Sequence, residues 1–190
     1  MKIINLLIGN AFHSLIIFID GIEKNHENDK QNKLFLVSHY SKKSLKYILT
    51  PSFTSISIFI TIIMMLNISF ILPYAVIIFN FNIPMPFMAA LLYIPTLIFF
   101  MVSFVSFKLI LKGECMGLMV FKHILLINWT LFCLSMLFSL ATGNVYWEIK
   151  IANAGMLLLC RYLMNSYSFD EMIKHYIYRR LLIEDIKERV

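Results

Sequence analysis

Residues 47 to 107 read YILTPSFTSISIFITIIMMLNISFILPYAVIIFNFNIPMPFMAALLYIPTLIFFMVSFVSF and contain no Asp, Glu, Lys, Arg or His. A helix rises about 1.5 Å per residue and the hydrocarbon core of a bilayer is about 30 Å thick. The stretch is therefore long enough to cross a membrane twice, with a turn between the crossings. The sequence predicts an integral membrane protein whose remaining segments are arranged around this apolar hairpin.

Charged residues are scarce and unevenly distributed. The chain has 190 residues, of which 59% are hydrophobic and 15% are charged, whereas a soluble domain carries about 25% charged residues. The net charge is +6, which in a soluble protein would suggest a nucleic acid partner. Here the basic residues fall in the predicted loops and tails, so membrane orientation explains them and no nucleic acid is expected to bind directly.

The predicted fold class is all-α: an integral membrane four-helix bundle with amphipathic N- and C-terminal helices. The bundle is expected to occupy residues 51–166, with spans at about 51–79, 87–107, 122–142 and 148–166. Of seventeen Lys and Arg residues, only Lys150 is placed on the translocated side and Arg161 within the last span. This asymmetry predicts both termini in the cytoplasm. The richness in Ile, Asn, Lys, Phe and Met is typical of AT-rich bacterial mobile elements, so the bacterial inner membrane is the expected location.

Amphipathic segments flank the bundle. Residues 1–50 are expected to form a cytoplasmic amphipathic helix at 1–22 and a basic linker, and residues 167–190 a cytoplasmic amphipathic tail that begins at the capping box of Ser168 and Glu171. The first helix is interpreted as lying on the membrane surface or docked on the bundle, with a signal anchor as the alternative. Its predicted apolar face is Ile4, Leu7, Ile8, Ala11, Leu15, Phe18 and Ile22, opposite Lys2, Asn5, Gly9, His13 and Asp20.

Three groups of residues are candidates for functional roles. A candidate intramembrane polar site consists of Arg161, Ser57 and Thr61, because an arginine within a span either snorkels to the interface or reaches inward to hydroxyl groups. Small residues at every fourth position form a candidate helix-packing face, or alternatively a homodimer face, of Ser135, Ser139 and Gly143. The candidate membrane-surface basic residues, expected to meet lipid head groups, are Lys42, Lys43, Lys46, Lys108, Lys112, Arg179 and Arg180.

No motif for catalysis, cofactor binding or metal binding is apparent. The cysteines, Cys115, Cys133 and Cys160, are far apart and have no spacing typical of zinc ligands. No phosphate-binding loop, nucleophile elbow or HExxH sequence occurs. Spans 1 to 3 lack any carboxylate, which argues against a proton-driven transporter. The expectation is a protein without a cofactor that is not an enzyme and acts by binding another protein.

The layout resembles two kinds of plasmid-borne inner-membrane protein. The features concerned are the uncharged hairpin Tyr47–Phe107, the basic loop Lys108–Lys122, the small outer turns and the basic tail Lys174–Arg189. They are similar to those of TraS-type entry-exclusion proteins, which block redundant conjugative DNA entry, and of immunity proteins against pore-forming colicins. The resemblance concerns size, hydropathy and charge layout, and it carries no residue roles.

Two features of the sequence help to choose between these interpretations. Immunity is expected to depend on span faces and outer turns that meet an inserting toxin, and the predicted turns are very small. Exclusion can also use cytoplasmic parts, and the amphipathic ends 1–50 and 168–190 are large. The sequence therefore favours entry exclusion through a partner in the transfer apparatus over recognition of a toxin. An accessory subunit of a membrane transport complex is the third hypothesis.

Overall fold

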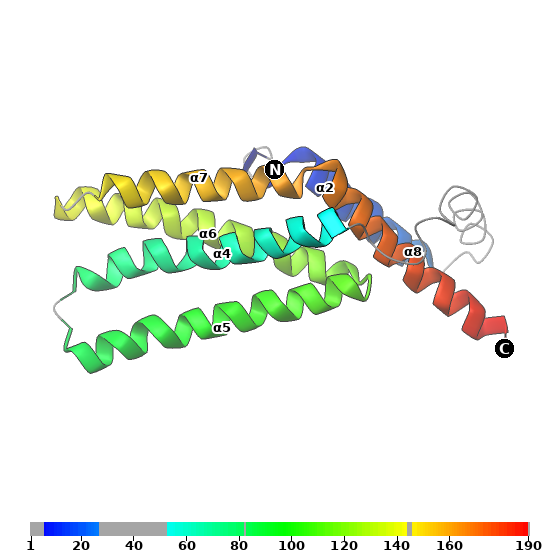
Figure 1. Cartoon of the computed structure of the whole chain (residues 1–190), viewed down its shortest axis with the longest axis horizontal. Helices are drawn as coiled ribbons and strands as arrows, with labels where there is room; N and C mark the ends of the chain where they lie inside the picture. Colours follow the sequence, from blue (N-terminus) through cyan, green and yellow to red (C-terminus); the bar gives the residue numbers. More distant parts are fainter. Residues whose placement is uncertain (1–5, 27–52, 82, 144–145, 190) are drawn as a thin grey trace.

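The computed structural model describes residues 6–81, 83–143 and 146–189, apart from residues 27–52. The regular secondary structure of these residues is entirely helical, so the chain is all-α as predicted. Four of the helices lie side by side along the long axis of the molecule (Figure 1). They are α4 (Phe53–Phe79), α5 (Met85–Leu111), α6 (Cys115–Thr142) and α7 (Trp147–Met164).

Helix α4 occupies the centre of this bundle and packs against α5, α6 and α7. Within the described ranges, α4, α5 and α6 are long and apolar enough to cross a membrane. Helix α7 has 18 residues and contains Glu148, Lys150 and Arg161, and it is not among those three. The sequence thus supports transmembrane helices, while the role of α7 depends on how its polar residues are covered.

Two prolines lie inside the long helices, Pro73 in α4 and Pro95 in α5. A proline has no N–H, so the carbonyl four residues earlier loses its helical partner. For Pro95 that carbonyl belongs to Leu91, and the hydroxyl of Tyr74 donates to it at 2.9 Å. A side chain of α4 therefore satisfies the backbone group that the proline leaves free, which is how membrane helices tolerate proline.

The prediction of a basic loop at Lys108–Lys122 is wrong, because most of this segment is helix. Helix α5 continues to Leu111 and α6 begins at Cys115, so only residues 112–114 connect them. Lys108 lies in the last turn of α5, and Lys122 and His123 lie within α6. The positions of charges mark where a chain leaves the hydrocarbon, but backbone hydrogen bonds extend a helix beyond that boundary into the polar region.

The terminal helices α2 (Asn10–His26) and α8 (Tyr167–Arg189) lie together at one end of the bundle, beside the α5–α6 turn (Figure 1). We call this the basic end. Helix α2 packs against α6, and α8 packs against α4, α5 and α7. The N-terminal segment is thus docked on the bundle, which was one of the alternatives from the sequence.

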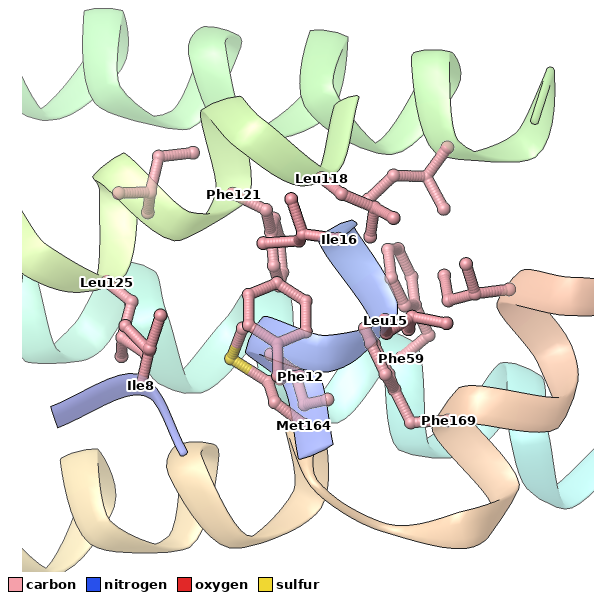
Figure 2. Packing of buried hydrophobic residues seen from close by; sticks show 14 of the residues in the cluster. Ile8, Phe12, Leu15, Ile16, Phe59, Leu118, Phe121, Leu125, Met164 and Phe169 are labelled. Atoms are coloured by element: carbon pink, nitrogen blue, oxygen red, sulfur yellow. The ribbon is translucent and has the colours of Figure 1, made fainter. Parts of the chain in front are cut away.

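The predicted apolar face of the N-terminal helix is rotated relative to the observed one. Ala11 is exposed and Phe18 is partly exposed, whereas Phe12, which was not assigned to that face, is fully buried. The reason is that α2 begins only at Asn10, after Gly9 has turned the chain with a φ of 89°. The buried face of this segment is Ile8, Phe12, Leu15, Ile16 and Ile19, which meets α4, α6 and α8 (Figure 2).

A cluster of phenylalanines joins the helices at the basic end. The Phe59 ring of α4 stacks on Phe107, Phe121 and Phe169, at centroid distances of 5.0, 5.6 and 5.8 Å. These partners come from α5, α6 and α8, and Phe12 of α2 meets the edge of Phe169 at 5.9 Å. Stacked and edge-to-face rings add stabilisation beyond the burial of their apolar area. The cluster therefore ties both terminal helices to the bundle.

The α5–α6 turn requires glycine at residue 113. Gly113 has a φ of 76°, and a Cβ atom there would lie 2.8 Å from the backbone oxygen of Tyr176 in α8. Both the backbone conformation and the close approach exclude a larger residue.

Replacing Gly113 with Ala should lower the free energy of unfolding by about 1–3 kcal/mol, because alanine disfavours a positive φ and its methyl group would displace α8. Thermal unfolding of the detergent-solubilised protein measures the effect. Gly155→Ala is the matched control, since nothing lies within 4 Å of a Cβ at this helical site. Equal unfolding midpoints for the two variants would contradict the prediction.

Candidate functional site

Asn165, at the end of α7, caps the beginning of α2. Its Oδ1 accepts a hydrogen bond from the N–H of Phe12 at 3.1 Å, and its Nδ2 donates to the carbonyls of Ile8 at 2.9 Å and Arg161 at 2.7 Å. The first N–H groups of a helix lack partners within that helix, and an asparagine side chain is well suited to satisfy one. In this chain the capping residue comes from a distant segment. A Cβ at Gly9 would overlap the Asn165 side chain, so glycine makes the approach possible.

Glu23 connects the other end of α2 to two further helices. Its Oε1 accepts from the N–H of Cys115 at 2.9 Å and from the Arg180 guanidinium at 3.0 Å. The first bond places a carboxylate at the N-terminus of α6, where the helix dipole favours negative charge. The second bond pairs α2 with α8. Together with Asn165, Glu23 fixes both ends of α2 against the bundle.

Four of the candidate membrane-surface basic residues have described positions, and they gather at the same end. Lys108 and Lys112 lie in and just after the last turn of α5, and Arg179 and Arg180 lie on α8, whose residues 176 and 177 meet the α5–α6 turn. Lys108, Lys112 and Arg179 are exposed, whereas Arg180 is half-buried by its pair with Glu23. We call Lys108, Lys112 and Arg179 the basic surface. Lys42, Lys43 and Lys46 lie outside the described residues.

The candidate polar site of Arg161, Ser57 and Thr61 is not joined by hydrogen bonds. The Thr61 hydroxyl donates to the Ser57 carbonyl one turn earlier in α4, at 2.8 Å. Arg161 is half-buried, and its Nε has no hydrogen-bond partner within the part of the chain that the structure describes. What the structure places around Arg161 is the Asn165 cap, which binds its carbonyl.

The candidate packing face divides into two parts. Ser135 and Ser139 are fully buried within the chain, whereas Gly143 is exposed and ends α6 with a φ of 72°. The Ser135 hydroxyl accepts a hydrogen bond from the Lys150 ammonium of α7 at 2.7 Å. The two serines thus face the chain's own α7, so the homodimer alternative for this face lacks their surface.

Lys150 was expected on the translocated side as an exposed charge of the outer turn. The structure places it in the first turn of α7, with its side chain directed into the bundle. Its side chain is only 3% exposed and lies between α7 and α6. Asn153, one turn further along α7, is 1% exposed. The sequence carries a signal for this burial: Lys150 and Asn153 are three residues apart, so they share one face of a helix. Ser135 and Ser139 provide a complementary polar face on α6.

Further polar side chains lie inside the bundle between α4 and α6. Asn128 of α6 is fully buried and donates to the Leu66 carbonyl of α4 at 3.2 Å. Asn67 is buried and donates to the Ile63 carbonyl of its own helix at 2.8 Å. Such bonds between membrane helices contribute about 0.6–2 kcal/mol each. Asn128 thus links α6 to α4, whereas Asn67 bonds within α4. No group of three or more metal-ligating side chains occurs among the described positions.

Comparisons with protein-family models, with curated proteins and with solved structures find no match for this chain. The functional interpretation therefore rests on the geometry of the basic end and of the bundle interior.

Replacing Asn165 with Ala should release α2, because the exchange removes the cap of Phe12 and the bond to Ile8. We expect a loss of about 1–3 kcal/mol and faster amide hydrogen exchange across residues 10–26, with α5 unchanged. Asn10→Ala is the control, since Asn10 is exposed. Unchanged exchange in α2 of the Asn165 variant would show that the cap does not hold the helix.

His175 should make the stability depend on pH. Burial, and then the positive charge of Arg179, lower the pKa of His175 below its ordinary value of 6.5. The folded protein thus binds fewer protons at this site than the unfolded chain. The contribution of this site to stability is complete above about pH 6.5 and is lost as the pH falls towards the lowered pKa.

Thermal unfolding of the wild type and of His175→Phe, at about pH 7.5 and about pH 5.5, measures this contribution. The phenylalanine keeps a ring beside Tyr176, which the histidine ring contacts at a centroid distance of 5.5 Å. The variant should lose less stability on acidification than the wild type. Equal losses would assign the pH dependence to other groups.

Proposed function

We propose that this chain is a multi-pass protein of the bacterial inner membrane that acts by recognising another protein, and that its role is entry exclusion against redundant conjugative DNA transfer. In this proposal α7 is a fourth span and both termini lie in the cytoplasm. The observation that carries the proposal is the preformed basic end, on which α2, α8 and the α5–α6 turn are held together.

The distribution of side chains on α7 supports its role as a span. Its polar residues Lys150 and Asn153 point into the bundle. Its exposed large side chains are apolar or amphipathic over most of its length: Trp147, Ile151, Leu158, Leu159 and Tyr162. A helix of 18 residues reaches about 27 Å, close to the thickness of a hydrocarbon core. Lipid on the outside and polar contacts on the inside are what a membrane environment favours.

The terminal helices support recognition through charge. Their apolar faces are buried against the bundle, with Phe12 and Ile16 of α2 and Phe169 and Ile173 of α8 all in the core. Lys108, Lys112 and Arg179 are exposed at this end and form the basic surface, beside exposed apolar side chains such as Ile17 and Met116. A partner that meets it would need an acidic face, and the association would weaken with salt.

A second candidate function, immunity against a pore-forming colicin, is favoured by a different surface. Helix α5 contacts α4 and α6 on one side and α8 near its end. Its other side exposes a continuous row of apolar residues, including Tyr93, Leu97 and Phe104, which lie on one helical face. An inserting toxin helix could pack on this row within the bilayer, where lipid otherwise covers it.

Two sets of substitutions separate these functions. The charge set is Lys108→Gln, Lys112→Gln and Arg179→Gln, and its control is Lys122→Gln on α6. The α5 set is Tyr93→Ala, Leu97→Ala and Phe104→Ala. Its control is Leu137→Ala, Leu140→Ala and Leu158→Ala, which are exposed leucines of α6 and α7. Cells that express each variant are scored for plasmid uptake from a panel of conjugative donors and for survival of a panel of pore-forming colicins.

We expect the wild type to reduce transfer from one donor class, and the charge set to restore that transfer at least about tenfold, since each tenfold change corresponds to roughly 1.4 kcal/mol of binding free energy. The α5 set and both controls should still exclude. Selective colicin survival that is lost only in the α5 set would establish immunity instead. If neither phenotype appears, both functions are refuted, and copurification with a host transport complex identifies the remaining hypothesis.

A further inference from the structure

The second region of interest lies at the end of the bundle opposite the basic end, between α6 and α7. Lys150 is 3% exposed, and the hydrogen bond to the Ser135 hydroxyl is the contact that its ammonium makes. Ser135 in turn donates to the Phe132 carbonyl at 2.9 Å. The one acidic residue of α7, Glu148, is exposed, and α4, α5 and α6 contain none. The charge of Lys150 therefore has no carboxylate partner within the described bundle.

Buried polar groups on either side of this pair lack partners. Asn153, 1% exposed, lies one turn from Lys150 on the same face of α7, and neither its Nδ2 nor its Oδ1 forms a hydrogen bond within the described part of the chain. The Ser139 hydroxyl, one turn from Ser135 on α6, is likewise buried without a partner there. Native proteins rarely leave such groups unsatisfied, and those that remain commonly mark an ion or a bound water.

Two features add positive charge at this site. Lys150 is the fourth residue of α7, so it lies next to the helix N-terminus, where unpaired N–H groups add partial positive charge. The available donors are an ammonium, an amide NH₂ and a hydroxyl. Water could satisfy the amide and the hydroxyl, but it would leave the ammonium charge uncompensated in a region of low dielectric, which is costly. An anion meets both requirements.

We propose that Lys150, Asn153 and Ser139 bind a small inorganic anion of the size of chloride between α6 and α7. The ammonium supplies the charge, and the amide and the hydroxyl donate the remaining hydrogen bonds. The anion neutralises the buried lysine and stabilises the α6–α7 pair. This site is independent of the proposed recognition function, because it lies inside the bundle at the opposite end from the basic surface.

Chloride itself is the probe. The full-length protein, in nanodiscs of zwitterionic lipid, is titrated with sodium chloride against sodium gluconate at constant ionic strength, and excess broadening of the chloride-35 NMR line reports binding. The wild type should show saturable broadening and a rising unfolding temperature. Lys150→Met should lose both responses. Lys122→Met makes the same exchange in the first half of α6, far from Ser135 and Ser139, and this variant should keep both responses.

Asn153→Leu provides a second variant if Lys150→Met does not fold. It should weaken chloride binding about tenfold, the effect of one lost hydrogen bond to a charged group. Two results would overturn the proposal: a wild type whose line width and unfolding temperature do not depend on chloride, or equal chloride responses in the wild type and in the folded Lys150 variant. Either result would assign the buried polar groups to internal water around a neutral amine.

Discussion

The aromatic cluster around Phe59 is the interaction on which the basic end depends. Its ring stacks on Phe107, Phe121 and Phe169, and Phe12 adds the N-terminal helix through Phe169. The buried faces of α2 and α8 belong to this cluster and to the apolar residues around it (Figure 2). Aromatic rings are large and rigid, so one ring can contact several helices at once. The terminal segments therefore form part of the core and are not free amphipathic helices.

Hydrogen bonds then fix the positions of the helix ends that the aromatic cluster brings together. Asn165 and Glu23 supply hydrogen bonds to helix ends that are covered by other segments, where backbone groups without partners would be costly. One apolar face of each of α2 and α8 is buried against the bundle, and the basic surface remains exposed beside it.

The opposite end of the bundle has a different character. There α6 and α7 enclose Lys150, Asn153, Ser135 and Ser139, and apolar side chains of α7 such as Ile151 and Leu158 point outward. This arrangement is inverted relative to a soluble bundle, and it is the one that lipid favours. This arrangement also explains why α7 packs in the bundle although it is less apolar than α4, α5 and α6: its polar residues Lys150 and Asn153 are buried.

The sequence alone determined that the chain forms helices. Hydropathy, the absence of charged residues, and the positions of proline and glycine are local properties, which do not depend on the rest of the fold. The predicted bounds of α4 and of the outer turns lie close to the observed ones. The predicted start of α6 is several residues too late, because charged residues mark the membrane boundary and not the end of a helix. Only the tertiary structure decided which faces are buried. The Asn165 cap of α2 joins residues 153 positions apart, and the burial of Lys150 depends on a serine of a neighbouring helix. Contacts of this kind follow from how helices pack together, and no local pattern contains them.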